Sequence, residues 1–261
     1  MFKIIRESFL GEWFNEKESV RLNLKGDLTS AFDYFAEEKV IDFCKKYFPF
    51  PVRVLTEVKE ESITKKGLPK YTLVIDPIDG ATNFRRGIEA GAFSVAVIPK
   101  SHKIHPNNVC FGLVGNIFSG TIYKAEKGKG AYCNGAKIMC STQNDPSKAC
   151  VGIDLDFDEK KKLARVINLI KETKYFRRNG SGTLDLVQVS NGAYDAYLDV
   201  RDKLTPENFL GAYLIIKEAG GIVTDPAGKE LEAAKRITDT YNIVASCNPV
   251  LHEKLIKLLK M

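Results

Sequence analysis

The segment Leu73–Phe84, which reads L-V-I-D-P-I-D-G-A-T-N-F, constrains the fold more than any other part of the chain. Its apolar start, Leu73–Ile75, is too short for a helix and is typical of the end of a buried strand. Because proline lacks the amide donor that a strand needs, Pro77 is expected to end this strand. Asp79 and Gly80 are typical turn residues. The segment therefore predicts a buried strand, a tight turn and a following helix.

The two carboxylates of this segment, Asp76 and Asp79, are expected to lie close together at the strand end. Like charges at short distance are unfavourable unless they share a proton or bind a cation. Mg²⁺ prefers such carboxylate oxygens and usually keeps substrate phosphate oxygens among its ligands. The backbone amides of Gly80, Ala81 and Thr82, at a turn that opens a helix, could bind an anion. A site for metal and phosphate is one interpretation, and a turn built from polar residues is the other.

The segment resembles the D-P-[IL]-D-G-T-x-N-F signature of the inositol monophosphatase family, the Mg²⁺-dependent, lithium-sensitive phosphomonoesterases. Further segments that are similar to the family extend from about Lys25 to about Gly221, so the resemblance covers most of the chain. It implies an α/β (α+β) fold arranged as an α-β-α-β-α layered sandwich of the sugar phosphatase type. It also implies two or three Mg²⁺ ions in each site and a homodimer.

The resemblance assigns roles to the acidic residues. Asp76, Ile78 and Asp79 would be metal ligands, and Asp79 would also belong to the catalytic group. The segment K-G-D-L-T-S-A-F-D is similar to the family's D-x-V-T-x-x-D, which places Asp33 at the outermost metal, where it would polarise the attacking water. Glu57 lies 19 residues before Asp76, close to the family spacing, and would bind metal and orient the water.

Two of these assignments have alternatives. Asp33 follows Ser30, a plausible N-cap, so its carboxylate could simply stabilise the first turn of a helix. Glu60 and Glu61 compete with Glu57, but they lie in a charged run that is typical of a solvated loop. The local sequence T-E-V also lacks the second acid of the family's usual G-E-E. We prefer Glu57 as the metal-binding glutamate.

The second half of the chain carries the predicted substrate contacts. The segment Arg177–Leu186, R-R-N-G-S-G-T-L-D-L, is similar to the family's R-x-G-S-A-A-L-D-L. The resemblance places Gly180 and Ser181 beside the hydroxyl groups of the substrate. It places Asp199 where the family hydrogen-bonds the substrate ring. Arg201 could bind a second phosphate or pair with neighbouring acids, and the sequence leaves both possibilities open.

The chain departs from the family pattern at two positions. Ala81 replaces the threonine of D-G-T, which removes a hydroxyl that would help to orient the water. Counting back from E-A-G-G, Asn208 replaces an aspartate that would bind two metals, and Glu207 precedes it. A neutral amide removes one negative charge from the metal site, which Glu207 could offset. We therefore expect a slower phosphatase that needs more Mg²⁺.

Composition sets the broad class of the protein. A chain of 261 residues that is 44% hydrophobic can form one large domain or two tightly packed halves. We expect residues 1–135 to carry the metal and phosphate site and residues 136–261 the substrate contacts, packed as one globular unit. Six cysteines without a C-x-x-C pair are typical of free thiols in a reducing cytoplasm. The net charge of +6 is typical of a lysine-rich surface and predicts no nucleic-acid partner. The early charges predict no signal peptide, and no apolar run predicts a membrane partner.

These observations favour hydrolysis of a small polyol or sugar phosphate by metal-activated water. Inositol 1-phosphate and fructose 1,6-bisphosphate are the first candidate substrates. A phosphatase for 3′-phosphoadenosine 5′-phosphate is a second possibility, although the sequence shows no recognisable adenine pocket. A third is a degenerate paralogue that acts as a binding or regulatory protein. Ala81 and Asn208 favour the third possibility, whereas the four retained acids favour an enzyme.

Overall fold

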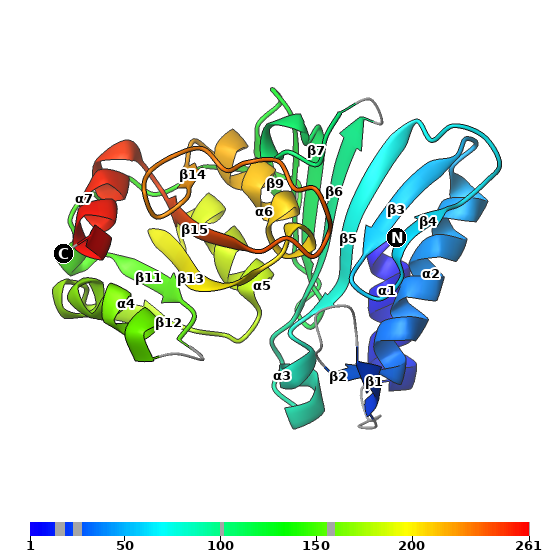
Figure 1. Ribbon diagram of the computed structural model, residues 1–261, viewed down its shortest axis with the longest axis horizontal. Helices are drawn as coiled ribbons and strands as arrows, with labels where there is room; N and C mark the ends of the chain where they lie inside the picture. The colour runs from blue at the N-terminus through cyan, green and yellow to red at the C-terminus, as the bar shows by residue number, and fades with distance from the viewer. Residues whose placement is uncertain (14–18, 23–27, 100–101, 156–159, 261) are drawn as a thin grey trace.

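The computed structural model describes residues 1–13, 19–22, 28–99, 102–155 and 160–260. These residues form five successive layers: helices, an eight-stranded sheet, further helices, a five-stranded sheet and a last pair of helices (Figure 1). This is the α-β-α-β-α sandwich expected from the sequence. Within the described part of the chain, no helix combines the length and the apolar character needed to cross a bilayer.

The eight-stranded sheet has the order β10-β9-β8-β7-β6-β5-β3-β4. Its neighbouring strands are antiparallel except for β3 and β5, which are parallel. Placing β5 inside the sheet explains its apolar sequence, because both of its faces are covered. The strands are β3 (Val52–Thr56), β4 (Glu60–Ile63), β5 (Tyr71–Asp79), β6 (Ala92–Pro99), β7 (Phe111–Asn116), β8 (Ile122–Glu126), β9 (Ala131–Cys133) and β10 (Ala136–Ile138).

Strand β5 is longer than the sequence predicts. Pro77 was expected to end it, but β5 continues to Asp79. Its register with β6 joins Asp76 to Ser94 and then Asp79 to Ala92, with an irregularity between the two pairs. Residues in such a bulge make no ladder hydrogen bond, so a proline is tolerated there. The prediction that Pro77 ends the strand is therefore wrong, and the bulge places both carboxylates at one strand end.

Helices α1 (Phe2–Ser8) and α2 (Ala31–Tyr47) cover the outer face of this sheet (Figure 1). Val40 and Cys44, one turn apart on α2, are buried in one hydrophobic cluster with residues of β3 and β5. This packing stabilises the helix through its apolar face. The remaining elements of this half are the π-helical turn η1 (Phe9–Trp13), the two-stranded sheet β1 (Ser19–Leu22) and β2 (Leu28–Ser30), helix α3 (Ala81–Arg86) and the 3₁₀ turn η2 (Pro106–Asn108).

The five-stranded sheet has the order β12-β11-β13-β15-β14. Helices α4 and α7 cover its outer face, and α5 and α6 lie between the two sheets (Figure 1). The first sheet ends at Ile138, close to the predicted division at residue 135, and that division stays a prediction. The elements are η3 (Pro146–Lys148), β11 (Cys150–Ile153), α4 (Lys160–Glu172), β12 (Tyr175–Arg177), α5 (Gly182–Val187), η4 (Gln188–Asn191), β13 (Ala196–Leu204), α6 (Pro206–Glu218), β14 (Ile222–Thr224), β15 (Tyr241–Ser246) and α7 (Pro249–Lys260).

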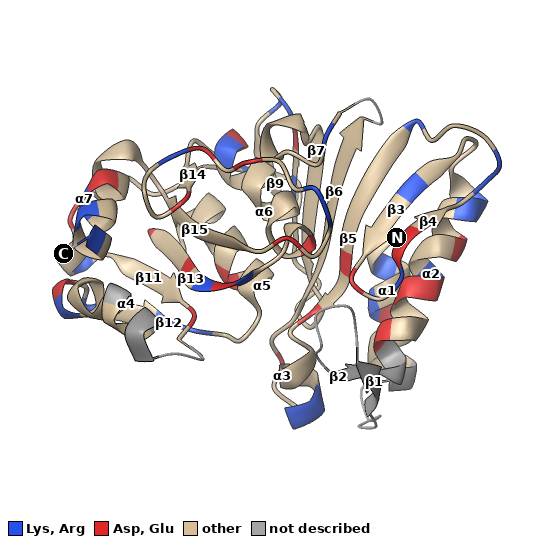
Figure 2. Ribbon diagram, viewed as in Figure 1, with Lys and Arg blue, Asp and Glu red and all other residues tan. Residues whose placement is uncertain are grey.

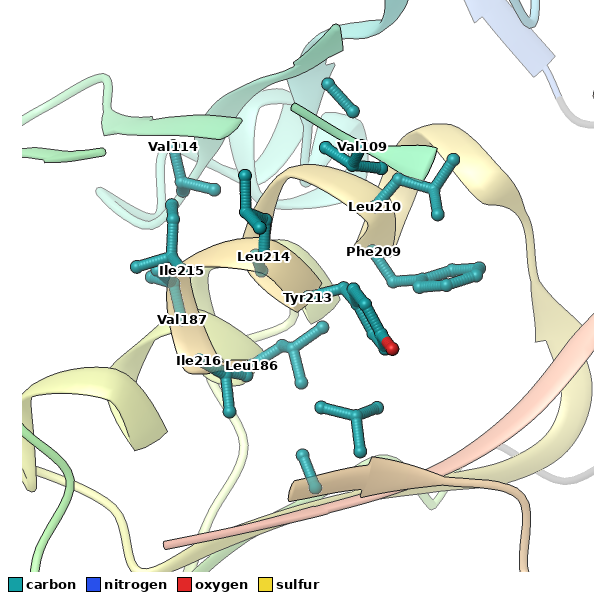
Figure 3. Close-up of a cluster of buried hydrophobic side chains, with 14 of the residues drawn as sticks. Val109, Val114, Leu186, Val187, Phe209, Leu210, Tyr213, Leu214, Ile215 and Ile216 are labelled. Atoms are coloured by element: carbon teal, nitrogen blue, oxygen red, sulfur yellow. The ribbon is translucent and has the colours of Figure 1, made fainter. Parts of the chain in front are cut away.

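Helix α6 is the centre of the largest hydrophobic core. Its apolar side chains pack towards both sheets, as Figure 3 shows for Leu210, Leu214 and Ile216. The helix approaches the first sheet so closely that a Cβ on Gly112 would lie 2.4 Å from the carbonyl oxygen of Gly211. Glycine is therefore required at this contact, because a larger residue would move the helix. The contact holds the middle of α6 close to β7.

Candidate functional site

The end of β5 meets the start of α6 at Asp76. This carboxylate is buried, with 3% of its residue surface exposed. Its Oδ1 accepts a hydrogen bond from the backbone amide of Ile78 (3.0 Å), and its Oδ2 accepts one from Nδ2 of Asn208 (2.8 Å). The structure thus brings together three of the residues that the sequence assigns to the metal site.

The side-chain oxygen of Asn208 faces away from Asp76. The backbone amide of Thr205 donates to this oxygen at 3.3 Å, as part of a capping box at the start of α6. Because a backbone amide needs an acceptor, this contact identifies the oxygen and directs the NH₂ group to Asp76. A neutral donor therefore contacts Asp76 where the family pattern has a carboxylate.

Asp79 is held by the start of α5. Its Oδ2 accepts hydrogen bonds from Oγ of Ser181 (2.5 Å) and from the backbone amide of Thr183 (2.8 Å). Burial raises the pKa of Asp79, and these hydrogen bonds partly offset that effect. Ser181, predicted to contact substrate, is fully buried and is committed here to Asp79. Thr183 was missed; its hydroxyl also donates to the carbonyl of Asn208 at 2.7 Å.

The predicted phosphate-binding amides lie at the start of α3. The helix begins at Ala81 after Gly80, whose φ is 100°. A Cβ on Gly80 would approach the Ala90 carbonyl oxygen to 3.0 Å, so both the conformation and the space favour glycine. The first amides of a helix have no partner within it, which leaves those of Ala81 and Thr82 for an anion. The hydroxyl of Thr82 accepts a hydrogen bond from Arg85.

Glu57 directly follows β3, at the same end of the sheet as Asp76. Strands β3 and β5 are parallel, and their register pairs Leu55 with Val74. Glu57 stands two residues beyond Leu55, and Asp76 stands two residues beyond Val74. The spacing of 19 residues between the two acids therefore equals the register offset of the strands. In parallel sheets, ligand sites form at the carboxyl ends of the strands, and β3 and β5 are the parallel pair of this sheet.

Helix α2 adds two buried acids, Asp33 and Glu37, with 8% and 0% of their surfaces exposed. Residues four apart lie on one face of a helix. Oγ1 of Thr56 donates to Oε2 of Glu37 at 2.6 Å. Burial raises the pKa of Glu37, and the nearby Glu57 raises it further. The sequence reasoning missed Glu37, although its helical spacing from Asp33 was a usable signal. Figure 2 shows acidic residues on both α2 and β5.

The predicted substrate contacts form a network of arginines and aspartates. Arg201 donates from Nε to Oδ1 of Asp199 (2.9 Å) and from a terminal nitrogen to Oδ2 (2.5 Å). It also contacts Asp154 at 3.3 Å, and Nε of Arg178 donates to that same carboxylate at 2.9 Å. Tyr197 donates to Asp154 as well. Of the two possibilities for Arg201, the structure contains the pairing with neighbouring acids. Asp154 was missed, because nothing local marks an aspartate after a strand as functional.

The backbone at Gly180 is also set by packing. Its φ is 77°, and a Cβ there would lie 2.8 Å from Oδ1 of Asn83. Nδ2 of Asn83 donates to the carbonyl oxygens of Ala90 and Asn179. These contacts join the segment after β12 to the helix that follows β5, so the predicted phosphate and substrate residues are adjacent in space.

The potential metal ligands at this site fit a hard cation such as Mg²⁺. In the part of the chain that the structure describes, the half-buried Asp79 has hydrogen-bond donors but no cationic partner, so the protein does not compensate its charge. The ligand atoms available at the β5 end are all oxygens, which Mg²⁺ prefers. Among the described residues, no three His, Cys, Asp or Glu side chains yet converge on one point. One acid of the family pattern is absent from this site, because Asn208 has an amide in its place.

Comparisons with known proteins agree with this geometry. The model of the inositol monophosphatase family matches residues 1–261. A fructose-1,6-bisphosphatase/inositol-1-monophosphatase of Thermococcus kodakarensis is 32% identical over 243 residues, which cover 93% of this chain and 87% of that protein. A bifunctional NADP phosphatase/NAD kinase of Methanococcus maripaludis is 30% identical and covers 94% of this chain and 45% of that protein.

The fold is also shared with solved structures. A crystal structure of an inositol monophosphatase–fructose 1,6-bisphosphatase matches with a TM-score of 0.81 at 29% identity, covering 98% of this chain and 95% of that chain. The match to the family model extends over every residue, and the relatives named above are phosphatases. The chain therefore belongs to the inositol monophosphatase family.

Proposed function

We propose that the protein is a Mg²⁺-dependent phosphomonoesterase that acts on a small polyol or sugar phosphate. The observation that carries this proposal is the position of Asp76 and Asp79 at the end of β5, next to the amides that open α3. Inositol 1-phosphate and fructose 1,6-bisphosphate are the first candidate substrates, because the names of the relatives include both activities.

The acidic residues would have two roles, metal binding and orientation of the attacking water. Asp76, Asp79, Glu57 and the backbone carbonyl of Ile78 would hold the metal ions, of which we expect two or three. When bound, Mg²⁺ lowers the pKa of a coordinated water and neutralises charge on the leaving oxygen. Asp33 and Glu57 would accept hydrogen bonds from the attacking water and hold it in line with phosphorus. The amides of α3 would bind the phosphate oxygens.

The two departures from the family pattern reduce this activity. Asn208 holds its amide nitrogen towards Asp76, so it would bind a metal only after its side chain turns over. We therefore propose weak binding at the metal that the missing aspartate would share. Ala81 offers its amide to phosphate but has no hydroxyl for the water. Glu207 is buried and accepts a hydrogen bond from Thr205, so it does not replace the missing acid in this arrangement.

The substrate end of the site suits hydroxyl groups. The carboxylate of Asp199 is neutralised by Arg201, and the pair presents polar groups without a net charge. We propose that this pair and the backbone at Gly180 border the polyol part of the substrate, whereas Ser181 is buried and holds Asp79. We further propose a homodimer in the cytoplasm, as expected from the family. The binding-protein and adenosine-phosphate alternatives remain outcomes of the test below.

The test is phosphate release with and without Mg²⁺ from inositol 1-phosphate, fructose 1,6-bisphosphate, NADP and 3′-phosphoadenosine 5′-phosphate. Asp79→Asn serves as the inactive variant, and Asp225→Asn as a matched control, because Asp225 only caps a turn by accepting backbone amides. Mg²⁺-dependent release that Asp79→Asn abolishes would support the enzyme and identify its substrate class. If no substrate releases phosphate even at high Mg²⁺, the protein is the binding paralogue.

A further inference from the structure

A buried carboxylate on another element contacts the turn that carries Glu57. Glu57 lies between β3 and β4, and Glu37 reaches this turn from α2. Oε2 of Glu37 accepts the hydrogen bond from Thr56, the residue before Glu57. The ammonium group of Lys59, two residues after Glu57, lies 3.9 Å from Oε1 of Glu37. Glu37 therefore contacts the turn on both sides of Glu57.

This turn needs such a contact, because its backbone is under tension. Glu60, which starts β4, has a φ of 60°, a conformation that costs free energy for a residue other than glycine. The amide of Lys59 also approaches Oγ1 of Thr56 at 3.4 Å, and the amide of Glu61 donates to the carbonyl of Lys59. The hydroxyl of Thr56 thus links the turn to Glu37, so a change at this hydrogen-bond acceptor would shift the main chain next to Glu57.

The carboxylate of Glu37 is buried at a cost in free energy. It is fully buried, and within the described part of the chain its Oε1 has no hydrogen-bond partner. Burying a charge with an unsatisfied oxygen is unfavourable, and the contacts with Thr56 and Lys59 offset this cost only in part. Asp33, the other buried acid of α2, stands one helical turn away. The carboxylate of Glu37 therefore lies at the contact between α2 and the Glu57 turn, where it holds the two elements together.

We propose that Glu37 is a positioning residue that holds Glu57 in the geometry needed to bind Mg²⁺. The proposal rests on the proposed function, because it concerns the metal ligands of that site. Glu37 acts through Thr56 on the main chain of the turn, and its negative charge is balanced by Lys59. Partners that orient metal ligands in this way typically change metal affinity by about 10–100-fold when they are removed.

The experiment measures Mg²⁺ affinity by calorimetric titration of the full-length protein without substrate, and then KM and kcat at saturating Mg²⁺. Glu37→Gln keeps an oxygen acceptor but removes the charge. Thr56→Val removes the hydroxyl donor, and Thr56→Ser restores it. Glu218→Gln is the matched control, because Glu218 also anchors a turn by accepting the amides of Gly128 and Gly130, far along the sheet from β5.

We expect Glu37→Gln and Thr56→Val to weaken Mg²⁺ binding about tenfold or more while KM at saturating Mg²⁺ stays constant. Thr56→Ser should stay within about twofold of the wild type. Glu218→Gln should lower the urea midpoint without changing Mg²⁺ affinity. Unchanged Mg²⁺ affinity in both Glu37→Gln and Thr56→Val would overturn the positioning role. If Glu37→Gln does not fold, the two Thr56 variants decide. A wild type that neither binds Mg²⁺ nor releases phosphate would overturn the proposed function, and this inference with it.

Discussion

Two regions of the molecule bury carboxylates in opposite ways. At the end of β5, Asp79 is contacted only by neutral donors, Ser181 and Thr183, among the described residues. Between β11 and β13, Asp199 and Asp154 are neutralised by Arg201 and further contacts. In the first region no cationic side chain within the described ranges offsets the negative charge, whereas in the second region an arginine offsets it. A region that leaves a buried negative charge uncompensated is suited to an external cation, whereas a balanced region serves packing and neutral ligands.

The largest expected effect comes from removing the uncompensated charge. Asp79→Asn keeps an oxygen acceptor for Ser181 and Thr183 but cannot bind Mg²⁺ as a carboxylate. We expect phosphate release to fall by more than about 100-fold, because even outer partners of metal ligands cost 10–100-fold. The urea midpoint without Mg²⁺ should not fall, since a buried charge is lost. A fall in stability with intact activity would show that Asp79 is a structural residue.

The balanced region should respond in the reverse way. Arg201→Met removes the cation and leaves Asp199 and Asp154 buried with less compensation. We expect the free energy of unfolding to fall by about 3–5 kcal/mol, as when one partner of a buried ion pair is removed. Arg6→Met is the control, because Arg6 donates only to the backbone carbonyls of Ile117 and Phe118. Equal losses in urea unfolding would contradict the importance of the ion pair.

Asp185 tests whether the lack of a cationic partner raises the pKa of a carboxylate in the second region as well. It lies near the balanced network, yet among the described residues only neutral Asn179 and Tyr194 contact it. Burial raises its pKa from 3.8 to about 6. The folded state therefore binds this proton more tightly than the unfolded state, and the stability from the protonated form is present below pH 4 and is lost as pH rises through 6. The loss amounts to about 3 kcal/mol.

The corresponding measurement compares Asp185→Asn with the wild type by urea unfolding between pH 3 and pH 8. The loss of hydrogen bonds in the variant lowers stability equally at every pH, but the variant has no carboxyl group at position 185 to titrate. Relative to the wild type, the variant should gain about 3 kcal/mol between the acidic and the neutral end of this range. A difference that is constant with pH would mean that Asp185 titrates normally, and that burial without a cation is not what distinguishes these carboxylates.

The same comparison shows which parts of the site the sequence could predict. The buried strand and the turn at Gly80 were predictable because they depend on neighbouring residues, but the end of the strand was not. The placement of Glu57 was predictable from its spacing of 19 residues before Asp76, which is close to that of the family and equals the register offset of the two parallel strands. The role of Ser181 was not predictable, because its contact with Asp79 spans 102 residues. The bulge at Pro77 also depends on the partner strand β6, which local rules for proline do not include.

Asn208→Asp should lower stability without metal and raise Mg²⁺ affinity at the end of β5. The variant places a second carboxylate beside Asp76 and removes the amide hydrogen bond, so repulsion should lower stability without metal by about 1–3 kcal/mol. Mg²⁺ would neutralise both acids, and we expect its affinity to rise about tenfold. Titration calorimetry and thermal unfolding with and without Mg²⁺ measure the two effects. Unchanged Mg²⁺ affinity would mean that position 208 lies outside the metal site.

The smallest effect is expected at Ala81. Ala81→Thr restores the hydroxyl of the family signature at the start of α3 without changing any charge, and Ala81 is only partly buried, so the larger side chain has room at a helix start. A hydroxyl that helps to orient the attacking water should raise kcat by a few fold, about 1 kcal/mol, which is the net contribution of one hydrogen bond. Mg²⁺ affinity should stay constant, because the metal ligands are untouched. Ala81→Ser tests the hydroxyl with less bulk, and Ala81→Val matches threonine in shape without it. A gain in Ala81→Val as large as in Ala81→Thr would assign the effect to packing on α3, and the water-orienting role would then have to come from Asp33 and Glu57 alone.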